Sequence, residues 1–469
     1  MPAFLSDITT RTVALSKLAD VEAELNQRWP ETKIDPTLAR MTALMDELGS
    51  PQRGYPAVHI AGTNGKTSVS RMIDALLTRL QWRTGRMTSP HLETVTERIS
   101  VADAPISAER CVDTFQDITP FVRIVDDRSL AGGGPAMSTF EVLTAMGFVA
   151  FADAAVDVAV VEVGLGGTWD ATNVIDGQVA VITPIATDHV DYLGSEITGI
   201  ARAKAGIVKP GSTAIVAEQG PEITEAVLRR CNEVEAVVAR EGAEFAVLAR
   251  QAVAGGQWLR LRGLGGVYDG IFLPVHGAHQ AQNAVLALAA VEAFLGAGPQ
   301  LDVRAVREAF AAVTTPGRLE RVRDAPTVFV DAAHNPHGAH ALAATLKAEF
   351  AVGTLVGVVA VLADKDAAGL LAALEPVFHR LVITSNDSPR AMAVEELAVH
   401  AAVHFGPERV VVAPTMAEAL PVAIAMARDS TEPGQSSGAA VVVTGSVVTA
   451  AQARVLLGAE VRPGGPSGD

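Results

Sequence analysis

The stretch Ala61-Gly62-Thr63-Asn64-Gly65-Lys66-Thr67-Ser68 joins an apolar run to an amphipathic segment. The run Ala57–Ile60 predicts a strand, and apolar residues at helical spacing predict a helix from about Lys66 to Leu80. Backbone N–H groups of a glycine-rich turn and the partial positive charge of a helix N-terminus are suited to bind a triphosphate. Lys66 would neutralise the far phosphate oxygens, and Thr67 or Ser68 would face a magnesium ion. The stretch therefore predicts a nucleotide-binding loop at the end of a strand.

The stretch departs from the common P-loop pattern at one position. Ile60 stands where the first glycine of that pattern belongs. A glycine-rich turn that binds nothing is the alternative interpretation, but the strand, loop and helix context favours nucleotide binding.

The chain has 469 residues, more than one hydrophobic core usually organises, so we expect two domains. A formal net charge of −16 argues against nucleic acid as a partner, because binding to phosphate backbones needs a basic face. Met1–Leu18 has no apolar core of signal-peptide length, and Gly353–Ala363 is too short to span a bilayer. We therefore expect a cytoplasmic protein that binds no membrane. Cys111 and Cys231 lie in no metal-like or redox-like pair and are expected to be ordinary thiols.

Short runs of Val, Ile and Ala alternate with helical patterns, which is typical of an α/β protein with a mainly parallel sheet. We expect a P-loop domain over residues 1–314, a second, smaller, doubly wound α/β domain over 315–461, and a disordered tail over 462–469. The first domain is expected to contain strands at Ala57–Ile60, Val156–Val163, Val179–Thr183 and Thr213–Ala217, a helix over Glu222–Arg240, and appended hairpins over Gln257–Phe272. The second is expected to contain strands at Thr327–Val330, Leu355–Val361, Leu381–Thr384, Val410–Val412 and Ala440–Thr444, with helices that start near Pro336, Ala367, Val394, Met416 and Val447.

Polar residues follow several of these strands, at the positions where open α/β sheets place their ligands. Glu162 ends a buried strand before a glycine-rich loop that leads to Asp170, and a carboxylate there suits Mg²⁺, which prefers oxygen ligands. Asp188 and His189 follow the next strand and point to the same edge of the sheet. A solvated strand-end carboxylate and a structural histidine are the alternative interpretations.

Three further segments carry weaker signals. Lys204 lies among small apolar residues, a setting typical of a surface side chain. Ser89 offers a hydroxyl before Pro90, but the two could form an ordinary turn. In the second domain, Asp331–Gly338 repeats the order of strand, loop and helix, although an Asn-Pro pair starts many helices.

In combination, these motifs resemble one family, the folylpolyglutamate synthases and bifunctional dihydrofolate synthases of the Mur ligase superfamily. The resemblance covers nearly the whole chain, and the motifs occur in the family's order. The matching segments are Gly62–Ser68, Ser89–Leu92, Phe140–Glu141, Glu162–Asn173, Asp188–His189, Lys204–Gly211, His279–Gln280 with Asn283, Pro316–Arg318, Asp331–Pro336, Asp364–Asp366 and Gly445–Ser446.

The resemblance implies a role for each site residue. ATP would be bound between the domains by Gly62, Thr63, Asn64, Gly65, Lys66, Thr67, Ser68, Asn283, Arg318 and Asp331. Two Mg²⁺ ions would be held by Ser89, Glu162, His189 and Lys204, with a carbamate on the lysine. Thr88, His91 and Asp170 would face the pterin ring, and His334 and Ser446 would face the incoming glutamate. The catalytic residues would be Lys66, Lys204, Arg318 and His334.

The resemblance also implies the reaction, which is ATP-driven amide formation, and we expect the enzyme to be a monomer. A substrate carboxylate would attack the γ-phosphoryl group, and the amino group of L-glutamate would then attack the acyl phosphate. We expect both a reduced folate and dihydropteroate as acceptors, although Thr168 stands where relatives often carry Arg. The alternatives are a Mur-type ligase that acts on a cell-wall precursor and a non-enzymatic ATP-binding switch.

Overall fold

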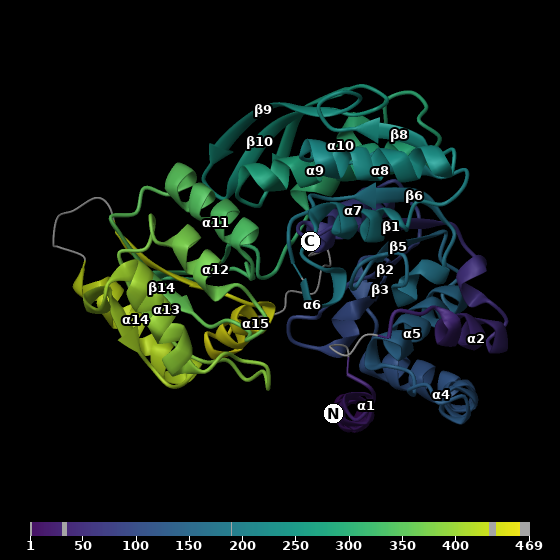
Figure 1. Cartoon of the computed structure of the whole chain (residues 1–469), viewed down its shortest axis with the longest axis horizontal. Coiled ribbons are helices and arrows are strands. Elements are labelled where there is room, and N and C mark those ends of the chain that lie inside the picture. The colour runs from purple at the N-terminus through teal and green to yellow at the C-terminus, as the bar shows by residue number, and fades with distance from the viewer. Residues whose placement is uncertain (1, 31–34, 189, 431–437, 460–469) are drawn as a thin grey trace. The chain divides into compact units, whose positions relative to one another are not determined.

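The computed structural model describes residues 2–30, 35–188, 190–430 and 438–459. The chain divides into two compact units (Figure 1). The first holds residues up to 246 together with 262–268 and 283–309, and the second holds 247–261, 269–282 and the residues from 310 onward. The predicted boundary at residue 315 lies close to residue 310, but nothing in the sequence pattern indicated that two earlier segments join the second unit. The predicted disordered tail, 462–469, lies outside the described residues.

An eight-stranded sheet forms the centre of the first unit, with the strand order β4-β3-β2-β5-β1-β6-β7-β8. The strands are β1 (Ala57–Ala61), β2 (Thr84–Met87), β3 (Ile99–Val101), β4 (Ala104–Pro105), β5 (Val158–Glu162), β6 (Gly177–Ile182), β7 (Thr213–Val216) and β8 (Val237–Arg240). The run from β2 to β8 is parallel, and β3 and β4 add an antiparallel edge. Since β1 lies between β5 and β6, the carboxyl ends of these three strands meet at one edge of the sheet.

Helices flank this sheet, some in contact with its strands and others packed on neighbouring helices. They are α1 (Pro2–Asn26), α2 (Ala39–Glu47), α3 (Lys66–Arg79), α4 (Ala108–Ala131), α5 (Thr139–Asp153), α6 (Val190–Leu193), α7 (Ile197–Ala205) and α8 (Pro221–Glu233), with α9 (Ala278–Phe294) and α10 (Val303–Ala311) later in the chain. The helix predicted after the nucleotide-binding loop is α3, in which Val69, Met72, Ile73, Leu76 and Leu77 are completely buried. In the described part of the chain, no helix combines the length and the apolar character needed to cross a membrane.

The second unit is built on a six-stranded sheet with the order β12-β13-β17-β14-β15-β16. Its strands are β12 (Glu320–Asp324), β13 (Thr327–Val330), β14 (Thr354–Val359), β15 (Arg380–Ile383), β16 (Val410–Val412) and β17 (Ala439–Thr444), and only β12 pairs in the antiparallel sense. The helices are α11 (Pro336–Glu349), α12 (Ala367–Leu374), α13 (Val394–Phe405), α14 (Met416–Asp429) and α15 (Val447–Leu456). A three-stranded sheet of β9 (Ala246–Val253), β10 (Gly256–Arg262) and β11 (Val267–Leu273) precedes it in the chain.

The α/β fold class predicted from the sequence is confirmed by this architecture, and the five predicted helix starts of the second domain coincide with those of α11 to α15. Local chemistry explains these starts. Asn335 accepts a hydrogen bond from the Gly338 N–H at 2.8 Å, and Pro336 occupies the first turn, where its missing N–H has no cost.

The helix predicted over Glu222–Arg240 is too long. Helix α8 ends at Glu233, and Val237–Arg240 forms strand β8 beside β7. The break falls at Glu235, which has a φ of +55°, in the left-handed region that a right-handed helix cannot contain. Tertiary pairing of the β-branched residues after this break overrides the helical pattern.

Candidate active site

The predicted nucleotide-binding loop lies between β1 and α3, at the edge where β1, β5 and β6 end. Gly65 precedes the helix with a φ of +89°, and Gly62 has a φ of +152°. A Cβ on Gly62 would come within 1.8 Å of the Thr183 Oγ1, so this position requires glycine. A Cβ on Gly65 would lie 2.6 Å from the Asn283 Oδ1, which places Asn283 of α9 against the loop.

The loop is held from one side by the segment after β6. The N–H groups of Thr63 and Asn64 donate to the Pro184 carbonyl at 3.0 and 3.3 Å. The Thr63 hydroxyl donates to the Ala186 carbonyl at 2.9 Å and accepts from the Ala186 N–H at 3.0 Å. The amides of Thr63 and Asn64 therefore serve to fix the loop, whereas the N–H groups of the first turn of α3 have no partner within the helix.

The segment after β6 is itself held by Gln219, a residue that the sequence did not single out. Its Nε2 donates to the Thr183 carbonyl at 3.0 Å, and its Oε1 accepts from the Ile185 N–H at 3.1 Å. A lone glutamine before a helix carries no signal of this kind, because the pairing depends on a fold that brings residues 34 to 36 positions apart together.

Two lysines converge on one carbonyl oxygen of the loop. Lys66 Nζ donates to the Gly62 carbonyl at 3.2 Å and to the Thr63 carbonyl at 3.3 Å, and Lys204 Nζ donates to the Gly62 carbonyl at 2.8 Å. Lys204 is buried in α7, contrary to the surface position that its apolar neighbours favour. Burial, followed by the charge of Lys66, lowers the pKa of Lys204 to about 7. Lys66 places positive charge at this loop within a protein of net charge −16, whereas burial favours the neutral form of Lys204.

A carboxylate and a hydroxyl lie together next to the loop. Glu162 ends β5 in register with Ile60 of β1 and is only 2% exposed. The Thr67 hydroxyl donates to its carboxylate, 3.1 Å from each oxygen. Two hard oxygen ligands next to the phosphate-binding turn fit Mg²⁺.

The other residues expected to bind metal are distributed as follows. Ser89 lies after β2 and precedes a cis peptide bond to Pro90. Asp188 lies close enough to Lys204 for its charge to raise the pKa of that lysine, against the larger effect of burial. His189 lies outside the described residues. Among the described residues, no cluster of three or more His, Cys, Asp or Glu side chains is arranged to hold a metal ion.

The loop expected to face the pterin is organised by two residues of a 3-10 helix, Val95–Arg98. The Glu97 carboxylate accepts hydrogen bonds from three successive N–H groups, those of residues 92, 93 and 94, at 2.8 to 2.9 Å. The Arg98 Nε donates to the His91 Nδ1 at 2.9 Å, and the Arg98 carbonyl accepts from the Thr88 N–H at 3.0 Å. Thr88 is buried and His91 is half-buried.

Asp170 lies inside the glycine-rich loop rather than on its surface. Its carboxylate accepts the Leu165 N–H at 2.8 Å, the Thr172 N–H at 3.0 Å and the Thr172 hydroxyl at 2.5 Å. The Thr172 hydroxyl also lies 2.9 Å from Nε2 of the completely buried His59 in β1. Burial raises the pKa of Asp170, against the opposing effect of these hydrogen bonds. The structure shows that Asp170 shapes the loop from within.

In the second unit, the expected residues lie at the ends of β12, β13 and β17. Asp331 accepts the Leu319 and Ala333 N–H groups, each at 2.8 Å, and the His334 Nδ1 lies 3.0 Å from the Ala332 carbonyl. Arg318 is half-buried in the turn before β12.

Ser446 is almost fully buried at the N-terminus of α15. Its hydroxyl accepts from the Thr449 N–H at 2.9 Å and lies 2.7 Å from the Thr449 Oγ1 and 3.3 Å from the Asn386 Nδ2. The Thr449 hydroxyl proton is directed to the Ala360 carbonyl, 2.8 Å away, so Ser446 is the donor in the pair of hydroxyls. Ser446 thus caps α15, a role that its place before the helix permits but that the expectation of glutamate binding did not include.

Comparison with protein families agrees with the geometry. Residues 60–291 match the Mur ligase middle domain, and residues 317–447 match the Mur ligase, glutamate ligase domain. A P-loop α/β domain followed by this second domain defines an ATP-dependent ligase of the Mur type.

Individual relatives identify the family within this class of ligases. The chain is 59% identical over 460 residues to the dihydrofolate synthase/folylpolyglutamate synthase of Mycobacterium tuberculosis, covering 95% of this chain and 94% of that protein. It belongs to the dihydrofolate synthase/folylpolyglutamate synthase family. The structure of M. tuberculosis folylpolyglutamate synthase complexed with ADP superposes with a TM-score of 0.92 at 58% identity, over 95% of this chain and 99% of that one. The structure of E. coli FolC in complex with DHPP and ADP gives a TM-score of 0.80 at 30% identity, over 94% and 98%.

Proposed function

We propose that the protein uses ATP to join L-glutamate to a reduced folate and also to dihydropteroate. The observation that carries the proposal is the convergence of Lys66, Lys204 and the Thr67–Glu162 pair on one turn at the start of α3. In this arrangement Lys66 would provide positive charge, and the Thr67–Glu162 pair oxygen ligands, where a triphosphate would lie. The names of the relatives support the choice of acceptors.

The proposed chemistry has two steps. The acceptor carboxylate attacks the γ-phosphorus of ATP, the bond to the β-γ bridging oxygen breaks, and ADP leaves. The amino group of L-glutamate then attacks the acyl phosphate, loses a proton and expels inorganic phosphate. Both steps need positioning and stabilisation of negative charge more than covalent help from the protein. We assign this stabilisation to Lys66, to Arg318 and to the N-terminus of α3.

We further propose that Ser89, Glu162, His189 and Lys204, the last as a carbamate, hold two Mg²⁺ ions. When bound, Mg²⁺ would neutralise phosphate charge during transfer. Asn283, Arg318 and Asp331 are proposed to contact ATP, Thr88, His91 and Asp170 to lie on the pterin side, and His334 and Ser446 on the glutamate side. His334 is proposed to be catalytic with Lys66, Lys204 and Arg318. Since the Ser446 hydroxyl is engaged within the protein, its contribution would be the position of the turn that it caps.

The test supplies ATP, Mg²⁺ and labelled glutamate with each acceptor in separate reactions, and follows labelled product and phosphate. We expect glutamate-dependent turnover with both acceptors. Product from the folate alone would reduce the proposal to a folylpolyglutamate synthase. Turnover only with a cell-wall precursor, or nucleotide binding without turnover, would contradict it in favour of the two alternatives. We also propose a cytoplasmic monomer, which sedimentation and cell fractionation would check.

A further inference from the structure

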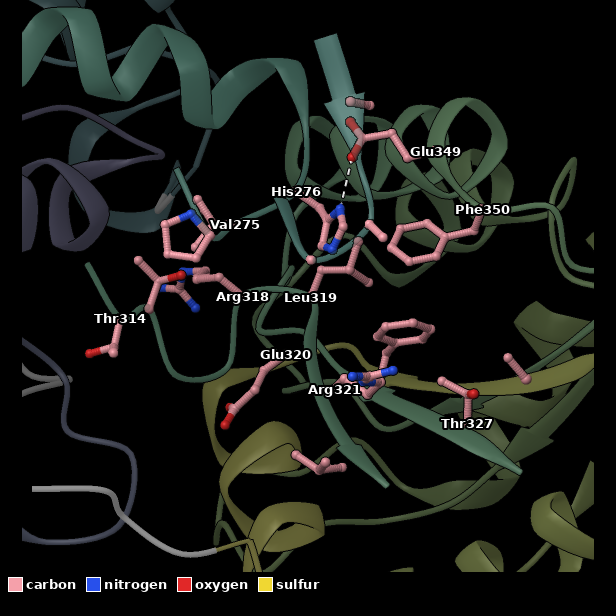
Figure 2. Close-up of a pocket in the computed structure, with 18 of the residues that line it drawn as sticks. Val275, His276, Thr314, Arg318, Leu319, Glu320, Arg321, Thr327, Glu349 and Phe350 are labelled. Carbon is pink, nitrogen blue, oxygen red and sulfur yellow. Dashed lines mark hydrogen bonds and ion pairs between the residues drawn. The ribbon is translucent and has the colours of Figure 1, made fainter. Parts of the chain in front are cut away.

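The turn that carries Arg318 has an unusual backbone. It joins residues 316 to 320 at the start of β12 and forms part of the wall of a cavity of about 1390 Å³ in the second unit (Figure 2). Gly317 has a φ of +68° and Leu319 has a φ of +43°. Glycine adopts this region without cost, but leucine does so only where the surroundings enforce it. Arg318 therefore sits between two residues in the left-handed region, in a conformation that the turn alone would not hold.

Two carboxylates enforce this conformation through backbone N–H groups. Glu320 Oε2 accepts from the Gly317 N–H at 2.8 Å, and Asp331 Oδ2 accepts from the Leu319 N–H at 2.8 Å. The Leu319 side chain is buried, and its packing in the interior helps to fix the turn. The residues on both sides of Arg318 are thus tied down, and the direction of the Arg318 side chain follows from theirs.

Glu320 is held in turn by a cation from a distant helix. The Arg454 Nη1 of α15 forms an ion pair with the Glu320 Oε1, while the Oε2 of the same carboxylate accepts the Gly317 N–H. The Arg454 side chain is 2% exposed and that of Glu320 is 27% exposed, so the pair is poorly screened by solvent. Figure 2 shows Arg318 and Glu320 leaving the turn in diverging directions, so that Glu320 acts on Arg318 through the backbone.

We propose that Glu320, oriented by Arg454, is a positioning residue that holds Arg318 in place for phosphoryl transfer. This inference rests on the proposed function, in which Arg318 stabilises the transferring phosphoryl group. A group that acts on charge in the transition state is sensitive to displacement, and a shift of about 1 Å can cost 10²-fold in rate. The pair should therefore affect kcat and the binding of the terminal phosphate more than the binding of ADP.

The variants are Glu320→Ala, which removes both contacts, Glu320→Gln, which keeps an acceptor for Gly317, and Arg454→Met, which keeps an unbranched apolar stem and removes the charge. We expect Glu320→Ala to lower kcat by about 10²-fold, and the other two by about tenfold, with little change in the KM for glutamate. The matched control is Arg321→Met, which breaks the exposed pair of Arg321 with Asp324 on the same strand and should leave kcat unchanged.

The deciding comparison is a double-mutant cycle with Arg318→Ala. If Glu320 acts through Arg318, Glu320→Ala should cause no further loss of kcat in the Arg318→Ala background. An equal loss in both backgrounds, or an unchanged kcat in Glu320→Ala, would overturn the proposal. Thermal denaturation of each variant identifies general destabilisation, which would lower affinity for every ligand together.

A binding measurement keeps the inference separate from the proposed reaction. Calorimetry with ADP and with a non-hydrolysable ATP analogue gives the affinity gained from the terminal phosphate. We expect Glu320→Ala and Arg318→Ala to reduce that gain by similar factors, with the ADP affinity unchanged. If the wild-type protein showed no turnover, the proposed function would fail. If Glu320→Ala kept the full affinity that the terminal phosphate adds in the wild type, the inference itself would be contradicted.

Discussion

The Thr67 hydroxyl lies 3.1 Å from both carboxylate oxygens of Glu162, so the first turn of α3 and the end of β5 meet side chain to side chain. Glu162 ends β5 and Thr67 lies in the helix that follows β1, the parallel neighbour of β5, so the pair closes one side of the nucleotide-binding loop. A carboxylate in this position is poised to receive a divalent cation beside a phosphate.

Glu162→Gln should raise the Mg²⁺ concentration needed for half-maximal activity by at least about tenfold, because it replaces a charged oxygen ligand with a neutral one. The Thr67 hydroxyl can still donate to the amide oxygen, so the fold should persist. His189→Ala should have a similar effect, and the two changes combined should not be additive if both residues serve one site. Magnesium titrations of turnover measure this, with the exposed Glu222→Gln as the control.

Lys66→Ala should lower kcat by about 10²- to 10³-fold, a loss of roughly 3–4 kcal/mol of transition-state stabilisation. Its two hydrogen bonds to loop carbonyls, at 3.2 and 3.3 Å, are long, so their loss should barely change the melting temperature. Steady-state kinetics at saturating ATP, together with thermal denaturation, measure both effects. A wild-type rate in this variant would mean that the turn at α3 does not bind the triphosphate.

His59 predicts a pH dependence of stability. Burial, followed by the charge of Lys209, lowers the pKa of His59 to about 3, and its Nδ1 has no hydrogen-bond partner among the described residues. Between pH 6.5 and about 3, His59 is protonated in the unfolded chain but neutral in the folded chain. The free energy of unfolding therefore falls as the pH falls through this window. At pH 4.5 the contribution amounts to roughly 2–3 kcal/mol relative to pH 7.

Replacing His59 with glutamine keeps a donor for Thr172 and removes the titration. The variant should lose less stability between pH 7 and pH 4.5 than the wild type, measured by urea unfolding with a probe in the first unit. His340→Gln, at an exposed position, controls for the loss of one imidazole. If the stability of wild type and of His59→Gln fell in parallel with pH, His59 would take up a proton in the folded state, which would contradict the prediction.

The features that could be predicted from the sequence are those that depend on neighbouring residues. The loop at Gly62–Ser68, the strand end at Glu162 and the capped start of α11 each follow from local chemistry, and all three occur where they were expected. The helix predicted to continue to Arg240 failed because strand pairing outweighed a local pattern.

Contacts between distant segments could not be predicted in this way. The clamp of Gln219 on the segment after β6 and the pair of Arg454 with Glu320 join residues whose local sequences carry no sign of each other. The burial of Lys204 belongs to the same class, because its small apolar neighbours favour a surface position for the side chain, whereas the fold places it in the interior. Only the packed fold decides between the two.

Lys204 gives the last prediction, which concerns its chemical form. A carbamate forms when the neutral amine attacks CO₂, so that a nitrogen–carbon bond is made and a proton is released. An amine with an ordinary lysine pKa is almost entirely protonated at neutral pH, whereas burial lowers the pKa of Lys204 to about 7 and leaves a substantial neutral fraction. The modified side chain would exchange a buried cation beside Lys66 for an anion, which relieves repulsion and adds oxygen ligands at the loop.

We therefore expect protein incubated with ¹³C-bicarbonate to show a carbamate signal by NMR, stronger when Mg²⁺ and nucleotide are present, and the signal should be absent from Lys204→Met. The same variant should lose most of its activity. Lys209→Met is the matched control, since Lys209 is a half-buried lysine five residues away whose Nζ donates to the Asn173 carbonyl at 3.0 Å. Full activity in Lys204→Met, or an unchanged carbamate signal in that variant, would show that Lys204 acts as an amine that holds the Gly62 carbonyl and nothing more.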